Sequence, residues 1–442
     1  MTEANIILKR FLLWTDDALK GGLLRKAYKT IRRLNFTGID ENTRGKMLSN
    51  IITYAKTHTT FYQQVDGTCL KDFPVINKAI VRQDYSAFRI PESDIPGQNG
   101  KPLKVHYTSG STGIPFKVFQ DRVSHIRNIA TLKYYNDLIG FHSCVPMMKI
   151  SIRESPDETN GTYIYDRKNN IWYANLTSLS EATLEELVGK INSEGIRFIR
   201  SYMTIIDDLT RYVIDHKVSL TSSPCFISIG ELLSEPLRHR IVDQMHLHIV
   251  SQYANEENGV IGQADIDGPG DLITLNLANH IIEVLKLDSD EPATDGEAGR
   301  VVLTDLTNHA MPMIRYDIGD LATVEESAPD GTPLKLRLHQ CRVCDIIHRT
   351  DGTPGTMTIP PEIWSKPGLR QLQFIQTGVK SYTLKVNTAM PEAFSSNDTT
   401  LFRDILGEDA EVAIDFTDEI PVVCAGKRKM IIQKCPTYVR QP

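Results

Sequence analysis

The stretch from residue 180 to residue 254 alternates between helical and strand patterns, and this rhythm restricts the folds open to the chain. A helix is predicted at 180–195, where Thr183 and Glu186 fit a capping box and the apolar positions share one face. Strands are predicted at IRFIRSY (196–202), CFISIG (225–230) and HIVSQYA (248–254), with a helix at 234–246 before the last strand. Alternating helices and strands build mostly parallel sheets, so we expect an α/β fold.

The pattern changes to β-strands after about residue 272. ITLNLANHIIEVL, GRVVLTDL and LATVEE alternate as strands do and predict a β-rich subdomain. From about residue 346 the strand-like FIQTGVKSYTLKVN and EVAIDF flank a helix near 398–406, which predicts a small α+β unit. A chain of 442 residues exceeds what one compact core holds. We therefore expect a large N-terminal domain at 1–344 and a small C-terminal domain at 345–442.

The composition argues against several classes of protein. The formal net charge of −6 gives no general attraction to nucleic acid or to an anionic membrane, so neither is expected as a partner. No apolar run approaches the roughly 20 residues of a membrane helix, and charged residues interrupt the N-terminal segment where a signal peptide would be apolar. Seven scattered cysteines do not form a secreted disulfide framework. A cytoplasmic location is therefore expected.

The segment YTSGSTGIPFK at 107–117 has the layout of a phosphate site. A strand is predicted at 103–107 and a helix at 121–140, so a loop of small residues connects the two. The loop consists of Thr108, Ser109, Gly110, Ser111, Thr112 and Gly113. Small side chains let backbone N–H groups approach a phosphate, and hydroxyls add donors. The Gly-Lys-[Ser/Thr] ending of a Walker A loop is missing, and a flexible surface loop is the alternative interpretation.

This loop resembles the phosphate-binding loop of the adenylate-forming superfamily, whose usual form is close to YTSGTTGxPK. Phe116 separates Pro115 from Lys117, and this shift of the lysine is similar to the phenylacetate–CoA ligase-like branch, which includes CapK-like proteins. The resemblance implies that Lys117 binds the nucleotide together with the loop. FYQQV (61–65) and FPVINK (73–78) also resemble the N-terminal region of this branch.

IGELLSE at 229–235 is similar to the family's GEPLSE segment. The resemblance implies that Gly230 and Glu231 lie beside the adenine of the nucleotide. A helix N-terminus that is capped by Ser234 is the alternative interpretation.

QYANEEN at 252–258 resembles the family's YGxTE motif, which implies that Tyr253 stacks on adenine and that Glu257 binds magnesium. A single glutamate suffices, because magnesium prefers one or two carboxylates together with phosphate oxygens. Ala254 replaces the family's glycine and Glu256 replaces its threonine, so Glu256 is a second candidate ligand for the metal. An acidic helix start is the alternative interpretation.

Two motifs follow in the family's order. MPMIRYDIGDL at 311–321 looks like RYDxGDL, which implies that Asp320 accepts hydrogen bonds from both ribose hydroxyls. QCRVCDII at 340–347 resembles GRxxDxI, which implies that Arg342 contacts ribose or phosphate and that Asp345 is the hinge of the small, mobile domain. Cys341 replaces the family's glycine beside that hinge.

AGKRKMIIQ at 425–433 is similar to the family's C-terminal GK segment. The resemblance implies that Lys427 reaches the α-phosphate and the substrate carboxylate, where a flexible cation suits the charge that develops during attack. A solvated basic tail is the alternative interpretation.

The residues His339, Cys341, Cys344 and His348 form an H-x-C-x2-C-x3-H pattern, whose residue types suit tetrahedral zinc. The loop is short for four ligands, and its cysteines overlap the stretch that should face the nucleotide. Buried thiols are therefore the preferred interpretation, with a redox pair as a third.

Taken together, the motifs imply an enzyme that uses ATP and magnesium to adenylate a carboxylic acid, with Lys427 and Glu257 as its catalytic residues. Coenzyme A is the implied acyl acceptor, while an amine, a hydroxyl or the thiol of a carrier protein stays open. Ala254 and Glu256 also leave open a degenerate relative that binds a nucleotide without turnover. Homodimers occur in the family.

The acid itself is not identified by the sequence. Arg153, Arg200 and His142 are candidates to meet a polar or second carboxyl group, although surface or structural roles are the preferred interpretation for each.

Overall fold

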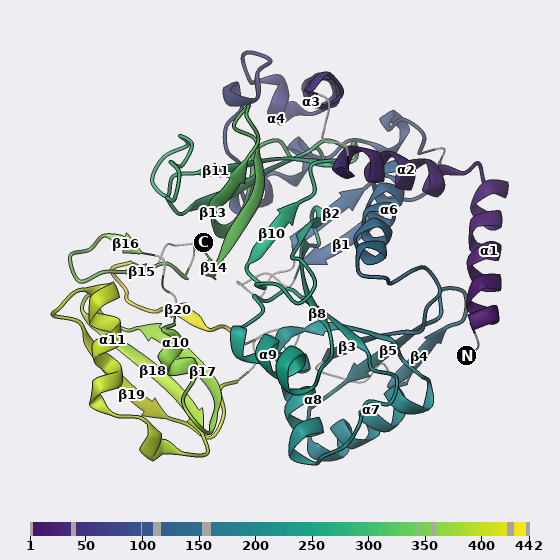
Figure 1. The fold of residues 1–442 in the computed structure, drawn as a ribbon. Helices are drawn as coiled ribbons and strands as arrows, with labels where there is room; N and C mark the ends of the chain where they lie inside the picture. Colours follow the sequence, from purple (N-terminus) through teal and green to yellow (C-terminus); the bar gives the residue numbers. More distant parts are fainter. Residues whose placement is uncertain are drawn as a thin grey trace.

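The computed structural model describes residues 3–36, 41–98, 100–108, 116–152, 161–342, 345–355, 357, 359–421 and 428–438. Within these ranges the strands form four sheets, one of them with twelve strands. Figure 1 shows this large sheet surrounded by helices, with a smaller layer of strands and helices formed by the C-terminal residues. The predicted α/β class is confirmed.

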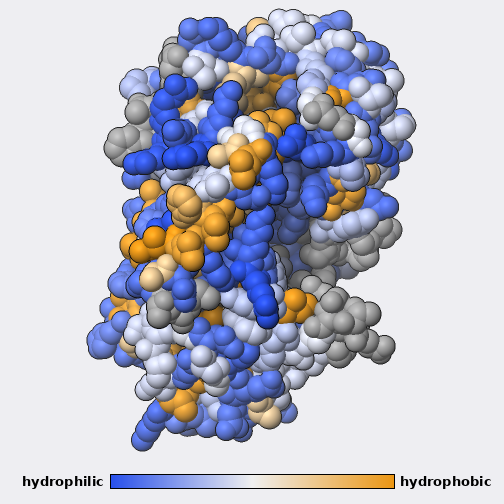
Figure 2. Space-filling model, turned by 90° about the vertical axis from the view of Figure 1, so that its right-hand side faces the viewer, coloured by the Kyte–Doolittle hydropathy of each residue, from blue (hydrophilic) through white to orange (hydrophobic). Residues whose placement is uncertain are grey.

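The N-terminal part is helical. Its helices are α1 (Glu3–Leu19), α2 (Leu23–Phe36), α3 (Glu41–His58), α4 (Thr60–Gln63) and α5 (Lys78–Gln83), with short 3₁₀ turns at Leu70–Asp72, Tyr85–Ala87 and Glu92–Asp94. Helix α1 exposes more than half of each of five apolar residues, Ile7, Leu8, Phe11, Leu12 and Leu19. Figure 2 shows apolar side chains gathered on the face of the molecule where α1 lies. Within the described ranges, no helix has the length and apolarity to cross a bilayer.

The large sheet has the strand order β11-β12-β13-β14-β10-β9-β8-β7-β6-β3-β5-β4. The run from β5 through β3, β6 and β7 to β8 is parallel, and the pairs on either side of it are antiparallel. These strands are β3 (Met147–Ile152), β4 (Tyr163–Asp166), β5 (Ile171–Leu176), β6 (Phe198–Tyr202), β7 (Cys225–Ile229) and β8 (Ile249–Asn255). The three predicted strands are β6, β7 and β8, whereas β3, β4 and β5 lie where no strand was predicted.

Helices cover both faces of the parallel strands. They are α6 (Arg122–Leu138), α7 (Glu181–Ser193), α8 (Met203–Asp215) and α9 (Glu235–His239), which continues into a π-helical turn at Arg240–Gln244. The apolar face of α7 packs with α8 on one side of the sheet. The capping box at Thr183 and Glu186 was wrong. Ser180 is the N-cap and accepts a hydrogen bond from the Thr183 N–H, because the helix begins at Glu181.

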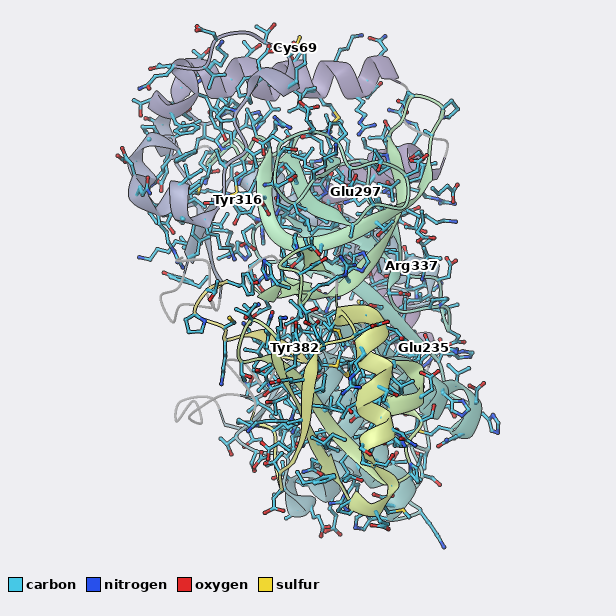
Figure 3. All side chains as sticks on the ribbon, turned by 90° about the vertical axis from the view of Figure 1, so that its left-hand side faces the viewer. Cys69, Glu235, Glu297, Tyr316, Arg337 and Tyr382 are labelled. Atoms are coloured by element: carbon cyan, nitrogen blue, oxygen red, sulfur yellow. The ribbon has the colours of Figure 1, made fainter. Side chains whose placement is uncertain are left out.

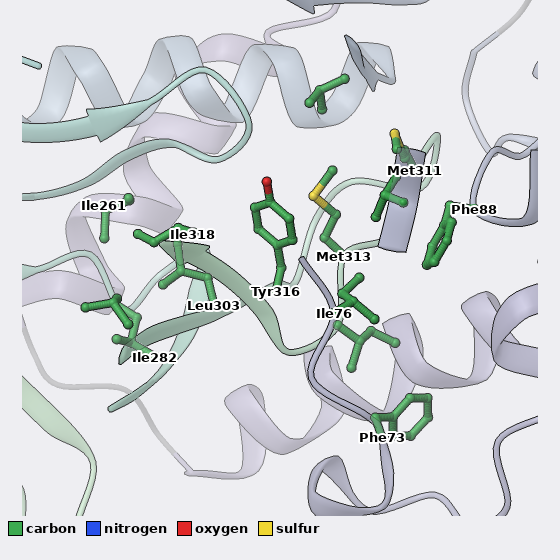
Figure 4. Packing of buried hydrophobic residues seen from close by; sticks show 14 of the residues in the cluster. Phe73, Ile76, Phe88, Ile261, Ile282, Leu303, Met311, Met313, Tyr316 and Ile318 are labelled. Atoms are coloured by element: carbon green, nitrogen blue, oxygen red, sulfur yellow. The ribbon is translucent and has the colours of Figure 1, made fainter. Parts of the chain in front are cut away.

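The antiparallel strands pack against the N-terminal segment. They are β9 (Gly259–Gln263), β10 (Leu272–Leu275), β11 (His280–Leu285), β12 (Gly299–Asp305), β13 (Tyr316–Ser327) and β14 (Pro333–Arg342), beside the separate hairpin of β1 (Lys104–Thr108) and β2 (Phe116–Gln120). Figure 4 shows Ile76 near Tyr316 in this core, with Phe73 farther away beyond Ile76. The buried Arg315 fixes the contact, since it donates to the Phe73 carbonyl at 3.0 Å and pairs with Glu283 at 3.1 Å.

The C-terminal residues form a four-stranded sheet of order β19-β18-β17-β20. Its elements are β17 (Leu369–Gln376), β18 (Ser381–Thr388), α11 (Ser396–Leu406), β19 (Glu411–Phe416) and β20 (Ile431–Gln433), preceded by β15 (Ile347–His348), β16 (Pro354–Gly355) and α10 (Pro361–Trp364), with a 3₁₀ turn at Pro391–Ala393. Figure 3 shows Tyr382 of this sheet below Tyr316 of the antiparallel strands. Arg211 of α8 docks the two parts together, because it donates to the carbonyls of Leu369 and Arg370.

Candidate active site

The strand β8 marks the centre of the candidate site. It ends at Asn255 and leads directly into Glu256 and Glu257, before β9 returns antiparallel to it. In open α/β sheets, ligands bind outside the carboxyl ends of the parallel strands, and this is such an end. The acidic helix start was therefore a wrong alternative, because residues 252–258 form the end of a strand and its turn.

Glu257 is a buried carboxylate, only 4% exposed. Its Oε1 lies 2.7 Å from Lys78 Nζ, and it accepts a hydrogen bond from the Tyr316 hydroxyl at 3.3 Å. Burial and then the neighbouring Glu257 raise the pKa of Tyr316 well above its usual value, so that the hydroxyl stays a donor. Lys78 is the first residue of α5, which Asn77 caps. The glutamate that the sequence assigned to magnesium is thus held by a lysine and a tyrosine.

One flank of the small-residue loop, Phe116, lies near the two partners of this glutamate. Thr108 and Phe116 are partners in the β1–β2 hairpin, and the Phe116 ring stacks with the Tyr316 ring at 6.5 Å between centroids. Lys78 Nζ lies 5.7 Å from the Phe116 ring. The predicted phosphate contacts Ser109, Gly110, Ser111, Thr112 and Gly113, and the side chain of Thr108, lie outside the described residues.

Lys117, the remaining residue of that motif, is exposed on β2. Its Nζ lies 5.8 Å from the Tyr107 ring, and its backbone N–H donates to the Tyr85 hydroxyl at 3.0 Å. The side chain therefore reaches along the hairpin surface from the base of the loop.

Tyr253, Asp320 and Arg342 come from three strands and meet in one cluster. The Tyr253 hydroxyl donates to Asp320 Oδ2 at 2.9 Å, and Arg342 Nε lies 2.9 Å from Asp320 Oδ1. Burial and then Asp320 raise the pKa of Tyr253 well above its usual value. Gly319 precedes the aspartate with φ of +82°, and a Cβ there would stand 3.1 Å from Arg342 Nη2. Glycine thus permits both the backbone turn and the approach of the arginine.

Glu256 has a different environment from Glu257. Its side chain is 61% exposed and lies 3.3 Å from His106 Nδ1 of β1. The two neighbouring carboxylates thus have different partners, since Glu256 pairs with a half-buried histidine and Glu257 with a half-buried lysine.

Gly230 and Glu231 follow β7, where Gly230 has φ of +71°. Glu231 accepts hydrogen bonds from the N–H and the hydroxyl of Thr204, at 3.0 and 2.8 Å. It also accepts one from the backbone N–H of Arg428, at 3.0 Å. The alternative of a capping Ser234 is wrong in its detail, because Ser234 precedes α9 but its side chain makes no capping hydrogen bond.

The C-terminal segment therefore reaches the same site. Lys427 itself lies outside the described residues, but Arg428 directly after it pairs with Asp208 of α8 at 3.5 Å. The neighbouring Lys429 pairs with the buried Asp345 at 2.8 Å. The residue predicted as the hinge is thus held by the same segment.

The pattern of histidines and cysteines is divided in the structure. His339 Nε2 lies 2.8 Å from the Thr323 hydroxyl, and the His348 ring stacks on Tyr438 at 3.9 Å. The side chain of Cys341 and all of Cys344 lie outside the described residues, so the zinc interpretation stays untested. Elsewhere in the described part of the chain, no group of three or more metal-ligating side chains occurs.

The structure places Arg200, a predicted candidate for a second polar contact, beside Lys149, which the sequence analysis missed. Lys149 of β3 and Arg200 of β6 are direct partners in the parallel ladder, and Tyr173 of β5 is the partner of Lys149 on its other side. Burial and then Arg200 lower the pKa of Lys149 to about 8, and burial lowers the pKa of Arg200 to about 10. The sequence signal was a single cation within an apolar run, in MMKISI and in IRFIRSY.

His142 and Arg153 were the other two candidates for contact with a polar group or second carboxyl group of the substrate. His142 is exposed and lies 2.9 Å from Asp137, so its surface role is confirmed. Arg153 lies outside the described residues.

The pair of Lys78 and Glu257 predicts a measurable coupling. Lys78→Met leaves Glu257 buried without its cation and should lower the free energy of unfolding by about 1–3 kcal/mol. Adding Glu257→Gln removes the unpaired charge, so the double variant should lose less than the sum of the single losses. Urea denaturation of the four proteins measures this. The exposed pair of Lys335 and Glu326, 2.9 Å apart, is the control and should show little coupling, while additive losses at Lys78 and Glu257 would contradict the prediction.

The lowered pKa of Lys149 predicts how stability depends on pH. The unfolded chain binds this proton up to the ordinary lysine pKa of 10.5 but the folded chain only up to about 8, so stability should rise with pH between the two. Below pH 8 the charged lysine destabilises the fold fully. Lys149→Met should therefore raise the free energy of unfolding at pH 7, by roughly 1–3 kcal/mol, and flatten the rise. Urea denaturation from pH 7 to 10 tests this, and an unchanged slope would count against it.

Two known proteins are similar to the chain over most of its length. No protein-family model matches the chain. Protein CapK of Staphylococcus aureus is 20% identical over 428 residues, which cover 92% of each chain. Phenylacetate-coenzyme A ligase of Pseudomonas putida is 22% identical over 404 residues, which cover 85% of this chain and 79% of the ligase.

Solved structures show the same fold. A 2-hydroxyisobutyryl-CoA ligase in the postadenylation state superposes with a TM-score of 0.65 and 16% identity, over 91% of both chains. The amide bond synthetase McbA from Marinactinospora thermotolerans has a TM-score of 0.54 and 15% identity, over 73% of this chain and 67% of its own. Over most of its length the chain is thus similar in sequence to CapK and to phenylacetate-coenzyme A ligase, and it has the fold of the solved acyl-CoA ligase.

Proposed function

We propose that the protein adenylates a carboxylic acid with ATP and then transfers the acyl group to coenzyme A. The observation that carries this proposal is the meeting of two clusters around the end of β8, Glu257 with Lys78 and Tyr253 with Asp320. The relatives support it, since one is a phenylacetate-coenzyme A ligase and another was solved in a postadenylation state. In the first step a carboxylate oxygen attacks the α-phosphorus, and pyrophosphate leaves with the electrons of the broken bond.

The nucleoside would bind at the Tyr253 cluster. Asp320 receives one donor on each of its oxygens, from Tyr253 and from Arg342, and this fixes the carboxylate in one orientation. A carboxylate held in this way can accept hydrogen bonds from the two hydroxyls of a ribose. We assign the adenine to the ring of Tyr253 and to Gly230 and Glu231, which follow the neighbouring strand β7.

The triphosphate would bind at the loop of residues 108–113, with Lys117 at its base. Glu257 fits the magnesium ion that accompanies ATP, because it is a buried carboxylate whose partners lie near one flank of this loop. When bound, the ion would neutralise phosphate charge. Lys78 already compensates the charge of Glu257 and so prepares the carboxylate in one place. Glu256 remains a second candidate for the ion, from its exposed position on His106.

We assign the developing charge on the α-phosphate to Lys427. Its neighbour Arg428 contacts Glu231 and Asp208, so the chain enters the site at this point. A large domain at 1–344 and a small one at 345–442 would then rotate about Asp345, and the thiol of coenzyme A would attack the acyl carbonyl to release AMP. Lys429 holds Asp345 at 2.8 Å in the present arrangement and would be released by such a rotation.

A second candidate differs only in the acceptor. The structural similarity to the amide bond synthetase McbA favours an amine in place of the thiol, and a hydroxyl or a carrier-protein thiol would react in the same way. The demand for ATP agrees with a cytoplasmic location. A homodimer stays a prediction from the family.

The proposed function is tested by pyrophosphate release from MgATP across a panel of carboxylic acids, with and without coenzyme A. Release should depend on the acid, and coenzyme A should raise it further, because the thiol removes the bound adenylate. A rise with amines but not with coenzyme A would select the second candidate. ATP binding without release for any acid would instead support the non-catalytic relative.

The assignment of Lys427 makes a separate prediction. Lys427→Ala should slow adenylation by about 10²–10³, because it removes a cation that acts in the transition state, while ATP binding should survive. Lys434→Ala is the matched control, since Lys434 is an exposed lysine in the same C-terminal segment and should leave the rate unchanged. Single-turnover pyrophosphate release and nucleotide titration measure the two quantities. A wild-type rate in Lys427→Ala would show that another residue stabilises the charge.

A further inference from the structure

Lys149 and Arg200 place two positive charges side by side inside the large part of the protein. The two residues are partners in the β3–β6 ladder, so their side chains leave the same face of the sheet. That face is opposite to the one covered by α7 and α8, because the alternate residues Met148 and Ile199 belong to the core under those helices. Lys149 Nζ rests 5.5 Å from the ring centre of Tyr173 on the next strand.

The pair lacks a carboxylate partner among the described residues. Neither cation forms an ion pair there, and Arg200 Nη1 is buried without a hydrogen-bond partner. The nearest acidic groups, Asp166 for Lys149 and Glu256 for Arg200, act only at a distance. Asp166 is already bound by Asn169 and by the backbone N–H of Lys168. Adjacent like charges that are removed from water destabilise a fold, so the pair has a use other than stability.

The position of Arg200 relative to the candidate active site indicates a role in ligand binding. Glu256, which influences Arg200, stands in the turn beside Glu257 and contacts His106. The second ring nitrogen of His106, Nε2, is also buried without a partner in the described part of the chain. Polar side-chain atoms without a partner therefore approach the candidate active site from β1 and from β6. A ligand that reaches Arg200 would need hydrogen-bond acceptors and negative charge.

We propose that the acid substrate is a dicarboxylate, whose second carboxylate is held by Arg200 and Lys149 while its first is adenylated. The inference rests on the proposed function, since it places this acid beside the nucleotide. Arg200 offers a planar fork that matches a carboxylate, and Lys149 adds a point charge from the adjacent strand. The ammonium group of Lys149 lies over the face of Tyr173. The substrate thus supplies the counter-charge that the pair lacks.

Carboxylates of the protein itself are an alternative source of negative charge for Arg200 and Lys149. Glu154, Asp157 and Glu158 follow β3 within residues 153–160, which lie outside the described residues. If one of these carboxylates neutralised the pair, Arg200 and Lys149 would be structural and would not select the substrate. The experiment must therefore separate selection from stability.

The experiment compares dicarboxylates with monocarboxylates of the same skeleton, such as adipate with hexanoate and terephthalate with benzoate, by pyrophosphate release. The native protein should favour the diacid of its best pair by roughly 10²-fold in kcat/KM, since a site built for a charged group rejects the analogue without it. Arg200→Met and Lys149→Met should each reduce this ratio at least about tenfold. Lys190→Met, which removes a lysine lying 3.8 Å from the Trp172 ring, is the matched control and should keep the ratio.

The ratio of kcat/KM for the diacid to kcat/KM for the monoacid distinguishes a loss of selectivity from general damage to the protein. A variant that is merely damaged loses both acids equally, and Arg200→Lys, which keeps the charge, should retain part of the preference. An equal loss for both acids in Arg200→Met and in Arg200→Lys would overturn the proposal, as would release with monocarboxylates alone. The latter result leaves the proposed function intact, whereas silence for every acid, with ATP bound, overturns both.

Discussion

The change from parallel to antiparallel pairing at β8 is the constraint on which the candidate site depends. On one side β8 continues the parallel ladder of β7, and on the other it turns back into β9. The turn between β8 and β9 carries Glu256 and Glu257, so both carboxylates stand where the two halves of the large sheet meet. Tyr253 comes from the parallel half and Asp320 from the antiparallel half. Their contact at 2.9 Å requires that both halves belong to one sheet.

Two groups of charged side chains near this turn differ in whether they have a counter-charge. Glu257 is buried but carries its counter-charge, since Lys78 arrives from the N-terminal segment and Tyr316 from β13. Arg200 and Lys149 are also removed from water, yet the described residues supply no carboxylate to either. The contacts of Glu257 fix the position of its carboxylate. The positive charges of Arg200 and Lys149 can be neutralised by a negatively charged substrate. Both arrangements join segments that lie far apart in the chain.

Among the described residues, polar contacts connect the C-terminal part to the candidate site. Arg428 reaches Glu231 and Asp208, Lys429 reaches Asp345, and Arg211 reaches the first residues of β17. These are mainly hydrogen bonds and ion pairs between polar groups, which exchange with water at lower cost than buried apolar surface does. The apolar core of this part is largely its own. Such an interface suits a unit that changes its position during a reaction, as the assignment of Asp345 requires.

Local sequence determined the motifs, the strands β6 to β8 and the α/β class, because short-range spacing and alternation encode them. It placed the cap of α7 wrongly at Thr183, because the helix begins at Glu181 and Ser180 is its N-cap. It also missed β3 to β5, whose apolar runs contain Lys149 and other polar residues. Only the tertiary structure decided that Lys78 meets Glu257 and that Lys149 stands beside Arg200. Those pairs are set by strand register and by packing between distant segments, which no local pattern of residues contains.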